Sequence, residues 1–331
     1  MLSDDSSLGS VSRRREQIAG CLVGLAVGDA VGAPLEFLSR RQVRNHFPQG
    51  LRDMTASRLW KKGEYTDDTQ MALLIAESLL QNKGFVASDL ARRFQAWART
   101  AKDVGIQTRA VVNMETYLSD PDRCSLRYYA DHPDSSAGNG ALMRCAPVAL
   151  FCLNSLEELV ETSRASARVT HHDPRAQSSC VILNAWIRAA ICRGDRDGRS
   201  EALALVKHDE LPAWNRLERI ETYDEEDIAS SGYTVQTMEA AAWSFLTTGS
   251  YEEAVVRAAN LGDDADTVAA VCGALAGAYY GYAAIPQRWR GHLKDEARIS
   301  RIALALGSYS DGTVPATFEN LLEEQNDGGN K

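Results

Sequence analysis

The chain has few features that break a fold or cross-link it. Among its 331 residues are only 9 prolines, and its 7 cysteines are scattered and never spaced C-x-x-C. An odd number of dispersed cysteines argues against a disulfide or zinc framework and predicts reduced thiols in a cytoplasmic protein. The first residues are acidic and polar, so we expect no secretory signal there.

Long runs of one charge are also missing. The net charge is −9, and no lysine or arginine run is long enough to follow a phosphate backbone, so we expect no nucleic-acid partner. Residues 268–285 carry no charge and have glycines at 273, 277 and 281, a spacing typical of membrane helix dimers. This stretch is rich in alanine rather than leucine, and Pro286 ends it, so we expect a buried helix and no membrane span.

Alternating β-branched runs bounded by turns are absent, whereas helical periodicity recurs along the chain. We therefore predict an all-α fold with one compact many-helix domain over residues 16–318. Residues 1–15 are expected to form a flexible polar tail, and residues 319–331 a disordered one. We expect loops at 38–64 and 118–136, and a surface connection at 208–231.

Two predicted helices, 17–31 and 267–283, carry ridges of glycine. In the first, glycine recurs every fourth residue at 20, 24, 28 and 32. Each glycine inside a helix costs about 1 kcal/mol, so the ridge needs a reason, and close approach of two backbones is the natural one. We predict that the two helices pack together. If they run antiparallel, Asp29 and Glu36 come near the acidic start of the second helix.

Two short motifs place acids and threonines at helix starts: residues 66–69 (Thr-Asp-Asp-Thr) and 264–267 (Asp-Ala-Asp-Thr). One interpretation is helix capping, with Thr66 or Asp67 at the first start and Asp263 or Asp264 at the second. The other is a site for Mg²⁺ or Mn²⁺, which prefer clustered carboxylate and hydroxyl oxygens. If the two starts face each other, the repulsion among their carboxylates requires cations, and a two-metal centre supplies them.

Two further motifs could contact a ligand. Residues 136–144 form a glycine-rich turn before an apolar helix, which suits either a phosphate or a tight turn. Its spacing fits neither the Walker loop nor the dinucleotide fingerprint. Residues 170–174 contain adjacent histidines that point in different directions, so only one ring could stack on a base or ribose, and the alternative is a structural role.

Five motifs together resemble the ADP-ribosylglycohydrolases: residues 24–36, 66–69, 137–144, 170–171 and 262–267. The resemblance runs from about residue 17 to 305 in the order of the family. It is closest to the bacterial branch that reactivates dinitrogenase reductase by removing ADP-ribose from arginine. It implies an all-α fold whose cleft holds two Mg²⁺ or Mn²⁺ ions.

The resemblance also implies roles for matching residues. The metal ligands would be Thr66, Asp67, Asp68, Asp264, Asp266 and Thr267. Glu36 would lie beside the metals, and Asp103 near the scissile bond, so that Asp67 or Asp103 would act as the base. Gly138, Asn139 and Gly140 would line the diphosphate. His171 and Tyr233 would lie on the adenosine or ribose side.

Two positions depart from arginine-directed relatives: Ile106 follows Asp-Val-Gly where Asn is usual, and Gln236 stands where many have Asp. Both departures concern the identity of the leaving group, which is the group attached to ADP-ribose. The expected function is a metal-dependent hydrolase that releases ADP-ribose from arginine of a mono-ADP-ribosylated protein. The alternatives are hydrolysis of O-linked ADP-ribose, on serine or a small metabolite, and a module that binds ADP-ribose or an ADP-ribosyltransferase toxin, with residues 1–16 as a docking arm.

Overall fold

A computed structural model describes residues 5–312. Within this range the chain forms helices and a single isolated β-bridge, between Gly138 and Tyr233, which confirms the all-α prediction. The α-helices are α1 (Asp5–Gly32), α2 (Arg40–His46), α3 (Asp67–Asn82), α4 (Ala87–Ala98), α5 (Ile106–Val112), α6 (Pro121–Asp131), α7 (Ala146–Phe151), α8 (Leu156–Arg168), α9 (Pro174–Arg193), α10 (Arg199–Ala204), α11 (Thr234–Leu246), α12 (Tyr251–Asn260), α13 (Ala265–Tyr280), α14 (Gln287–Arg290) and α15 (Glu296–Ser310). Short 3₁₀ helices are η1 (Leu211–Trp214), η2 (Leu217–Thr222), η3 (Glu225–Asp227) and η4 (Tyr282–Ala284).

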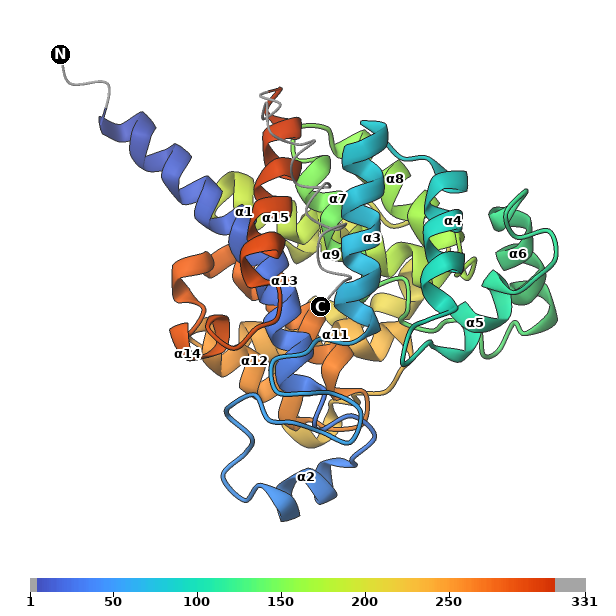
Figure 1. The fold of residues 1–331 in the computed structure, drawn as a ribbon. Coiled ribbons are helices and arrows are strands. Elements are labelled where there is room, and N and C mark those ends of the chain that lie inside the picture. The colour runs from blue at the N-terminus through green and yellow to red at the C-terminus, as the bar shows by residue number, and fades with distance from the viewer. Residues whose placement is uncertain (1–4, 313–331) are drawn as a thin grey trace, which may run out of the picture.

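Helices α1 and α13 pack against each other at the centre of the molecule (Figure 1). Their glycine ridges meet: a Cβ at Gly20 would lie 2.4 Å from the carbonyl oxygen of Gly277, and one at Gly28 would lie 2.0 Å from that of Ala269. Gly20 faces the end of α13 and Gly32 faces its first residue, so the helices run antiparallel. The predicted close approach is therefore confirmed, and the C-terminal end of α1 lies beside the start of α13.

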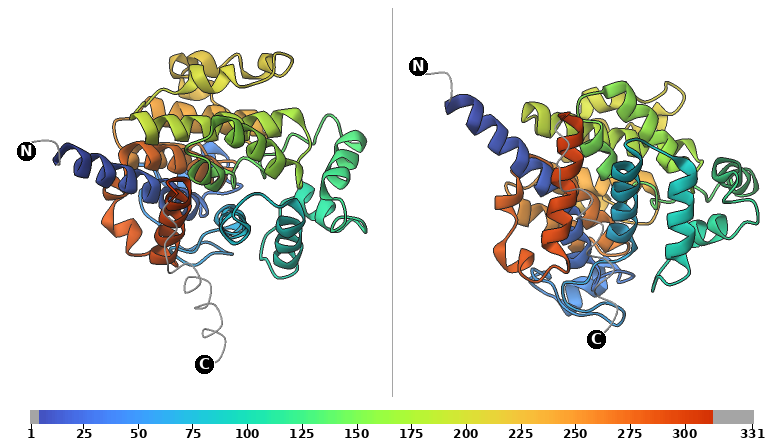
Figure 2. Two further views of the ribbon diagram at one scale, coloured as in Figure 1. Left: turned by 90° about the horizontal axis from the view of Figure 1, so that it is seen from above. Right: turned by 45° about the horizontal axis from the view of Figure 1, so that its top comes forward.

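Helices α9, α11, α12 and α15 pack against this pair, and the N-terminal end of α1 projects beyond them in both views of Figure 2. Every residue from 265 to 278 in α13 is buried, which explains why this helix is apolar on all sides. From α12, the Tyr251 hydroxyl donates a 2.9 Å hydrogen bond to the Gly24 carbonyl of α1. Among the described residues, no helix combines the length and apolarity needed to span a bilayer.

Several predicted loops are helical. Helix α1 begins at Asp5, so residues 5–15 are helical rather than loose, and this end projects from the body of the molecule (Figure 1). Residues 1–4 and the predicted tail 319–331 lie outside the described residues. Helix α2 interrupts the loop predicted at 38–64, because Ser39 and Gln42 form a capping box.

The loop predicted at 118–136 contains α6. Its prolines suggested a break, but Pro121 occupies the first turn of the helix, where a missing N–H costs nothing. The Asp120 side chain caps this start by accepting from the Arg123 amide at 3.0 Å. Ser155 and Ser250 cap α8 and α12 in a similar way, since each side chain accepts from the amide three residues further on.

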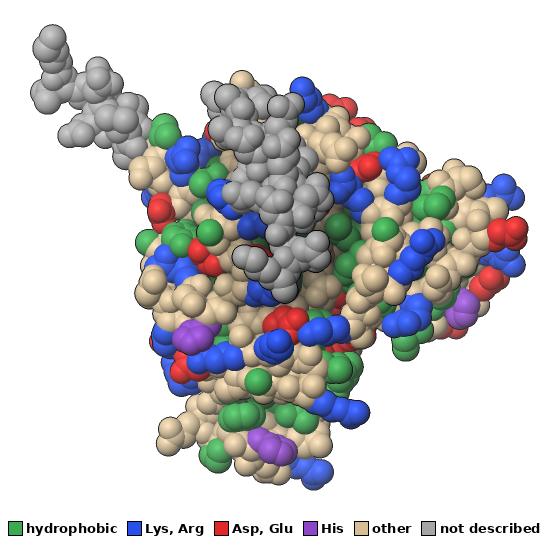
Figure 3. Space-filling model, in the orientation of Figure 1, with side chains coloured by type: hydrophobic (Ala, Val, Ile, Leu, Met, Phe, Trp, Pro, Cys, Tyr) green, Lys and Arg blue, Asp and Glu red, His purple; other side chains and the backbone are tan. Residues whose placement is uncertain are grey.

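The cysteines form no disulfide with one another, and the visible surface carries charges of both signs. All seven cysteines are free, and six of them are buried. On the face drawn in Figure 3, lysine and arginine side chains are interspersed with aspartate and glutamate, and no basic stripe crosses this face.

Candidate active site

A buried carboxylate joins α1 to the start of α3. Asp29 has no exposed surface, and its oxygens accept from the Thr66 amide at 2.9 Å, the Thr69 amide at 3.1 Å and the Thr69 hydroxyl at 2.6 Å. The Thr66 hydroxyl accepts from the Asp68 amide at 3.4 Å. Backbone groups left unpaired at this helix start are thus satisfied by Asp29 and Thr66, and the carboxylates of Asp67 and Asp68 are not needed for capping.

A second contact fixes Glu36 beside the start of α13. The turn after α1 and the turn before α13 exchange two backbone hydrogen bonds: Phe37 N–H to Asp263 O and Asp263 N–H to Leu38 O, both 2.7 Å. Gly262, Phe37 and Asp263 have positive φ angles of 78°, 64° and 55°. A Cβ at Gly262 would lie 2.5 Å from the Leu38 carbonyl oxygen, so only glycine allows the two turns to approach this closely.

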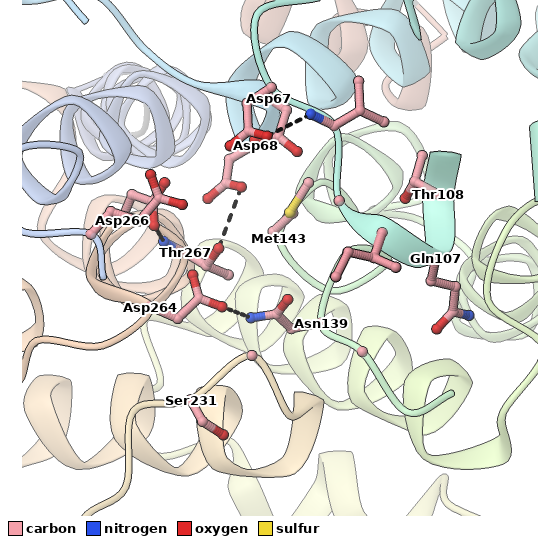
Figure 4. Close-up of a pocket in the computed structure, with 18 of the residues that line it drawn as sticks. Asp67, Asp68, Gln107, Thr108, Asn139, Met143, Ser231, Asp264, Asp266 and Thr267 are labelled. Atoms are coloured by element: carbon pink, nitrogen blue, oxygen red, sulfur yellow. Dashed lines mark hydrogen bonds between the residues drawn. The ribbon is translucent and has the colours of Figure 1, made fainter. Parts of the chain in front are cut away.

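The two helix starts open onto one cavity of about 910 Å³ (Figure 4). It brings together most of the predicted site residues, namely Glu36, Asp67, Asp68, Asp103, Gly138, Asn139, Gly140, His171, Asp264, Asp266 and Thr267. Thr66 and Tyr233 are not among the lining residues. Thr66 is buried behind them as the cap of α3. The Arg175 guanidinium lies over the Tyr233 ring, with its Cζ atom 5.5 Å from the ring centre.

Capping accounts for only part of the acids at the start of α13, where Asp266 Oδ1 accepts from the Thr267 amide at 2.9 Å. Asp264 occupies the N-cap position, yet its side chain makes no capping hydrogen bond. Across the cavity, the Thr267 hydroxyl lies 3.4 Å from Asp68 Oδ1 (Figure 4), whereas Asp68 Oδ2 is buried and has no hydrogen-bond partner within the described part of the chain. A buried carboxylate oxygen without a donor is costly, so this cluster is incomplete as a purely structural feature.

Burial and mutual repulsion disfavour the charged form of these carboxylates. Burial, followed by the charges of Asp103 and other neighbouring acids, raises the pKa of Glu36 to about 8 and that of Asp67 to about 7. Burial and neighbouring acids also raise the pKa of Asp68 and Asp266 well above the usual range. A bound cation would relieve this repulsion and hold the groups ionised.

The donor set fits a hard divalent cation. Carboxylate oxygens and the Thr267 hydroxyl are the ligand types that Mg²⁺ and Mn²⁺ prefer, and the unpartnered oxygen of Asp68 points to a missing positive group. Among the described residues, no group of three or more His, Cys, Asp and Glu side chains is placed to hold a metal ion as it stands.

The glycine turn forms the wall facing the acids. Asn139 Nδ2 donates to Asp264 Oδ2 at 2.7 Å and to the Thr237 hydroxyl at 2.9 Å, which locks this turn to the start of α13. His171 packs on the turn, since a Cβ at Gly140 would lie 2.9 Å from its Cε1. His172 points away to Asp122, 3.4 Å from its carboxylate. The predicted divergence of the two histidines is confirmed.

Sequence reasoning missed several residues of this cavity. Gln107, Thr108, Met143 and Ser231 line it, and all but the last are drawn along the wall near α5 and the glycine turn (Figure 4). Gln107 and Thr108 come just after Ile106, which follows the Asp-Val-Gly segment, and this closeness to Asp103 in the sequence was the one available signal. Met143 belongs to the motif of residues 137–144 but was given no role, and Ser231 carries no motif.

The fold and the site define a class: an all-α protein in which acids at two helix starts face a glycine turn across a cavity. The profile of the ADP-ribosylglycohydrolase family matches residues 10–314, and the chain belongs to this family. It is 34% identical to "ADP-ribosylarginine hydrolase Tri1" of Serratia proteamaculans, over 88% of this chain and 79% of that protein. It is 32% identical to "ADP-ribosyl-[dinitrogen reductase] glycohydrolase" of Rhodospirillum rubrum, over 88% and 95%. A solved structure titled "ADP-ribosylglycohydrolase-related protein complex" superposes with a TM-score of 0.71, at 34% identity, over 90% of this chain and 99% of that chain.

Proposed function

We propose that this protein hydrolyses the N-glycosidic bond between ADP-ribose and an arginine side chain of a mono-ADP-ribosylated protein. The observation that supports this most is the cavity itself, where carboxylates from α3 and α13 face a glycine turn suited to a diphosphate. Relatives whose names specify ADP-ribosylarginine and ADP-ribosylated dinitrogen reductase match along 88% of the chain.

Two Mg²⁺ or Mn²⁺ ions would complete the site. Their ligands would be Thr66, Asp67, Asp68, Asp264, Asp266 and Thr267. When bound, the ions supply a positive charge that polarises ribose oxygens and acidifies water. Asn139 would keep the Asp264 carboxylate turned toward the glycine turn through its 2.7 Å hydrogen bond, and Asp29 would hold the start of α3 in place.

The chain's own residues would then move protons. In the reaction, a water oxygen bonds to the anomeric carbon of the ribose as the bond from that carbon to the guanidino nitrogen breaks. One water proton passes to a carboxylate, Asp67 or Asp103, and a proton must reach the departing nitrogen. Asp103 already accepts from the Val104 amide at 2.7 Å, which fixes its orientation at the cavity wall. Glu36, held beside α13, would position the ribose or carry a proton.

One observation favours a second leaving group. Ile106 is the first residue of α5, lines the cavity and is 86% exposed, so it is free to contact the group attached to ADP-ribose. An apolar side chain at this place offers no hydrogen bond to a guanidinium. Hydrolysis of O-linked ADP-ribose, on serine or a small metabolite, is therefore the alternative.

The test compares ADP-ribose release from matched peptides modified on arginine and on serine. We expect faster release from the arginine peptide, and loss of roughly a hundredfold or more in kcat for Asp67→Asn and Asp264→Asn. Asp134→Asn, at an exposed loop position, is the matched control and should keep full activity. Release only from the serine peptide would establish the alternative. Binding of ADP-ribose without any release would instead identify a binding module.

A toxin partner remains a separate prediction. The helical segment 5–15 projects from the body (Figure 1), where it could contact an ADP-ribosyltransferase. Deleting residues 2–15 should leave release from small substrates unchanged and weaken such a complex. An unchanged complex would count against a docking role for this segment.

A further inference from the structure

Behind the glycine turn lies a guanidinium that is wholly buried and, among residues 5–312, forms no salt bridge with a carboxylate. Arg144 has no exposed surface, and its hydrogen bonds go to the Thr170 hydroxyl at 2.6 Å and to Met71 Sδ at 3.8 Å. Its planar face lies on the Phe94 ring, 4.5 Å from the ring centre. Burial lowers the pKa of Arg144 only to about 10, so it stays charged near neutral pH. A charge kept at this cost calls for a function.

The Thr170 hydroxyl connects this charge to the cavity. A guanidinium can only donate, so Thr170 Oγ1 accepts from Arg144 and its own proton is free to donate. The other neighbour of this oxygen is His171 Nδ1 at 2.7 Å. If Nδ1 carried a proton, the Thr170 proton would point at no acceptor in a buried site. The arrangement that satisfies all three groups has Thr170 donating to a bare Nδ1.

It follows that the proton of His171 is on Nε2. Burial and the charge of Arg144 lower the pKa of His171 well below its usual value, so the ring is neutral. Its Nε2 atom faces the glycine turn, since Cβ atoms at Gly138 and Gly140 would lie 3.5 and 3.0 Å from it. The cavity therefore holds a fixed neutral N–H donor beside this turn.

Gln107 extends the same network. Its amide nitrogen donates to the Thr170 carbonyl at 3.2 Å. Its Oε1 is buried, finds no hydrogen-bond partner among the residues that the structure describes, and would lie 3.5 Å from a Cβ at Gly138. The segment 170–171 is thereby held on both its backbone and its side-chain groups. The cavity also gains an acceptor next to the His171 donor.

We propose that Arg144 is a positioning residue that acts through Thr170 to hold His171 in its Nε2–H tautomer, so that this nitrogen donates to an oxygen of the ligand beside the glycine turn. That the ligand is ADP-ribose rests on the proposed function. The buried guanidinium also places a positive charge behind the glycine turn, whereas the starts of α3 and α13 are acidic. An anionic diphosphate is therefore directed to the glycine turn and the ribose to the acids.

The first measurement is the tautomer of His171, which needs no ligand. Two-bond ¹H–¹⁵N spectra of the full-length protein with ¹⁵N-labelled histidine distinguish the tautomers, and His171→Gln assigns the signal. We expect the Nε2–H pattern in the wild type and in Thr170→Ser, and a mixture of tautomers in Thr170→Val and Arg144→Met. If Arg144→Met fails to fold, the two Thr170 variants still decide. An unchanged Nε2–H pattern in Thr170→Val would overturn the proposal.

The second measurement is the affinity for ADP-ribose, by calorimetry with Mg²⁺ present. We expect Thr170→Val to weaken binding about tenfold and Thr170→Ser to retain it, because the hydroxyl alone separates the two variants. Thr248→Val is the control. It removes a buried hydroxyl that donates to the Ser244 carbonyl at the end of α11, so this variant should bind ADP-ribose normally. Wild-type affinity in Thr170→Val would contradict the relay. No binding by the wild type would contradict the proposed function, and the tautomer would still test the relay.

Discussion

The crossing of α1 and α13 makes Gly28→Ala the sharpest test of the fold. An alanine Cβ there would lie 2.0 Å from the Ala269 carbonyl oxygen, and real Cβ contacts essentially never fall below 3.0 Å, so the two backbones must separate by about 1 Å. A backbone oxygen cannot rotate away as a side chain can. Overpacking of this kind costs about 3 kcal/mol, and the better helix propensity of alanine returns about 1 kcal/mol.

We therefore expect Gly28→Ala to lower the free energy of unfolding by about 2 kcal/mol, and Tm by roughly 4 °C for a domain of this size. Thermal melts and urea titrations measure both quantities. Gly84→Ala is the matched control, because a Cβ there meets nothing within 4 Å, and it should change stability by no more than about 0.5 kcal/mol. A Gly28→Ala protein as stable as the wild type would refute the close crossing.

Three further predictions concern the site. Asp68→Asn removes a buried negative charge, so it should make the metal-free protein more stable at pH 8. It should also abolish the rise in Tm on adding Mg²⁺, which thermal melts with and without chelator measure. An undiminished rise in Tm would show that Asp68 is not a metal ligand. Raised pKa values of Asp67 (about 7) and Glu36 (about 8) mean that the folded metal-free state binds more protons than the unfolded state, so its stability should fall as pH rises from 5 to 8. Urea titrations of chelator-treated protein across that range measure this, and stability that rises with pH would contradict it. Ile106→Asn should increase the ratio of kcat/KM for arginine-linked over serine-linked ADP-ribose, and an unchanged ratio would show that Ile106 does not contact the leaving group.

The central helices could be predicted because their signal is repeated along the sequence. Glycine at every fourth residue of α1, matched in α13, has few explanations other than contact between backbones, and the structure confirms that contact. The antiparallel direction then brings Glu36 to Asp264, as expected. Four positions with one physical cause are a stronger signal than any single residue.

Short helices were harder to predict because one local interaction decides them. Helix α6 depends on Asp120 and Pro121, which serve equally well in a turn, and α2 depends on the capping box of Ser39 and Gln42. The sequence of residues 5–15 has no apolar stripe at helical spacing, so it does not predict a helix there. It continues a long helix that is anchored farther along the chain.

The site could be predicted in part, because side-chain chemistry is visible in the sequence and hydrogen-bond partners are not. Asp29 was expected near the acids, but its task of holding the backbone of Thr66 and Thr69 depends on segments about 40 residues apart. Arg144 belonged to a motif, yet its contact with Thr170 exists only in the folded chain. The cavity roles of Gln107 and Ser231 likewise arise from folding alone.

The most direct test of the central claim is release of ADP-ribose from an arginine-ADP-ribosylated protein, measured with excess chelator and again after Mg²⁺ or Mn²⁺ is restored. If the acids of α3 and α13 form a cation-dependent hydrolase site, release should stop with chelator and return with either ion. Release that continues undiminished in chelator, or none under any condition, would contradict the account.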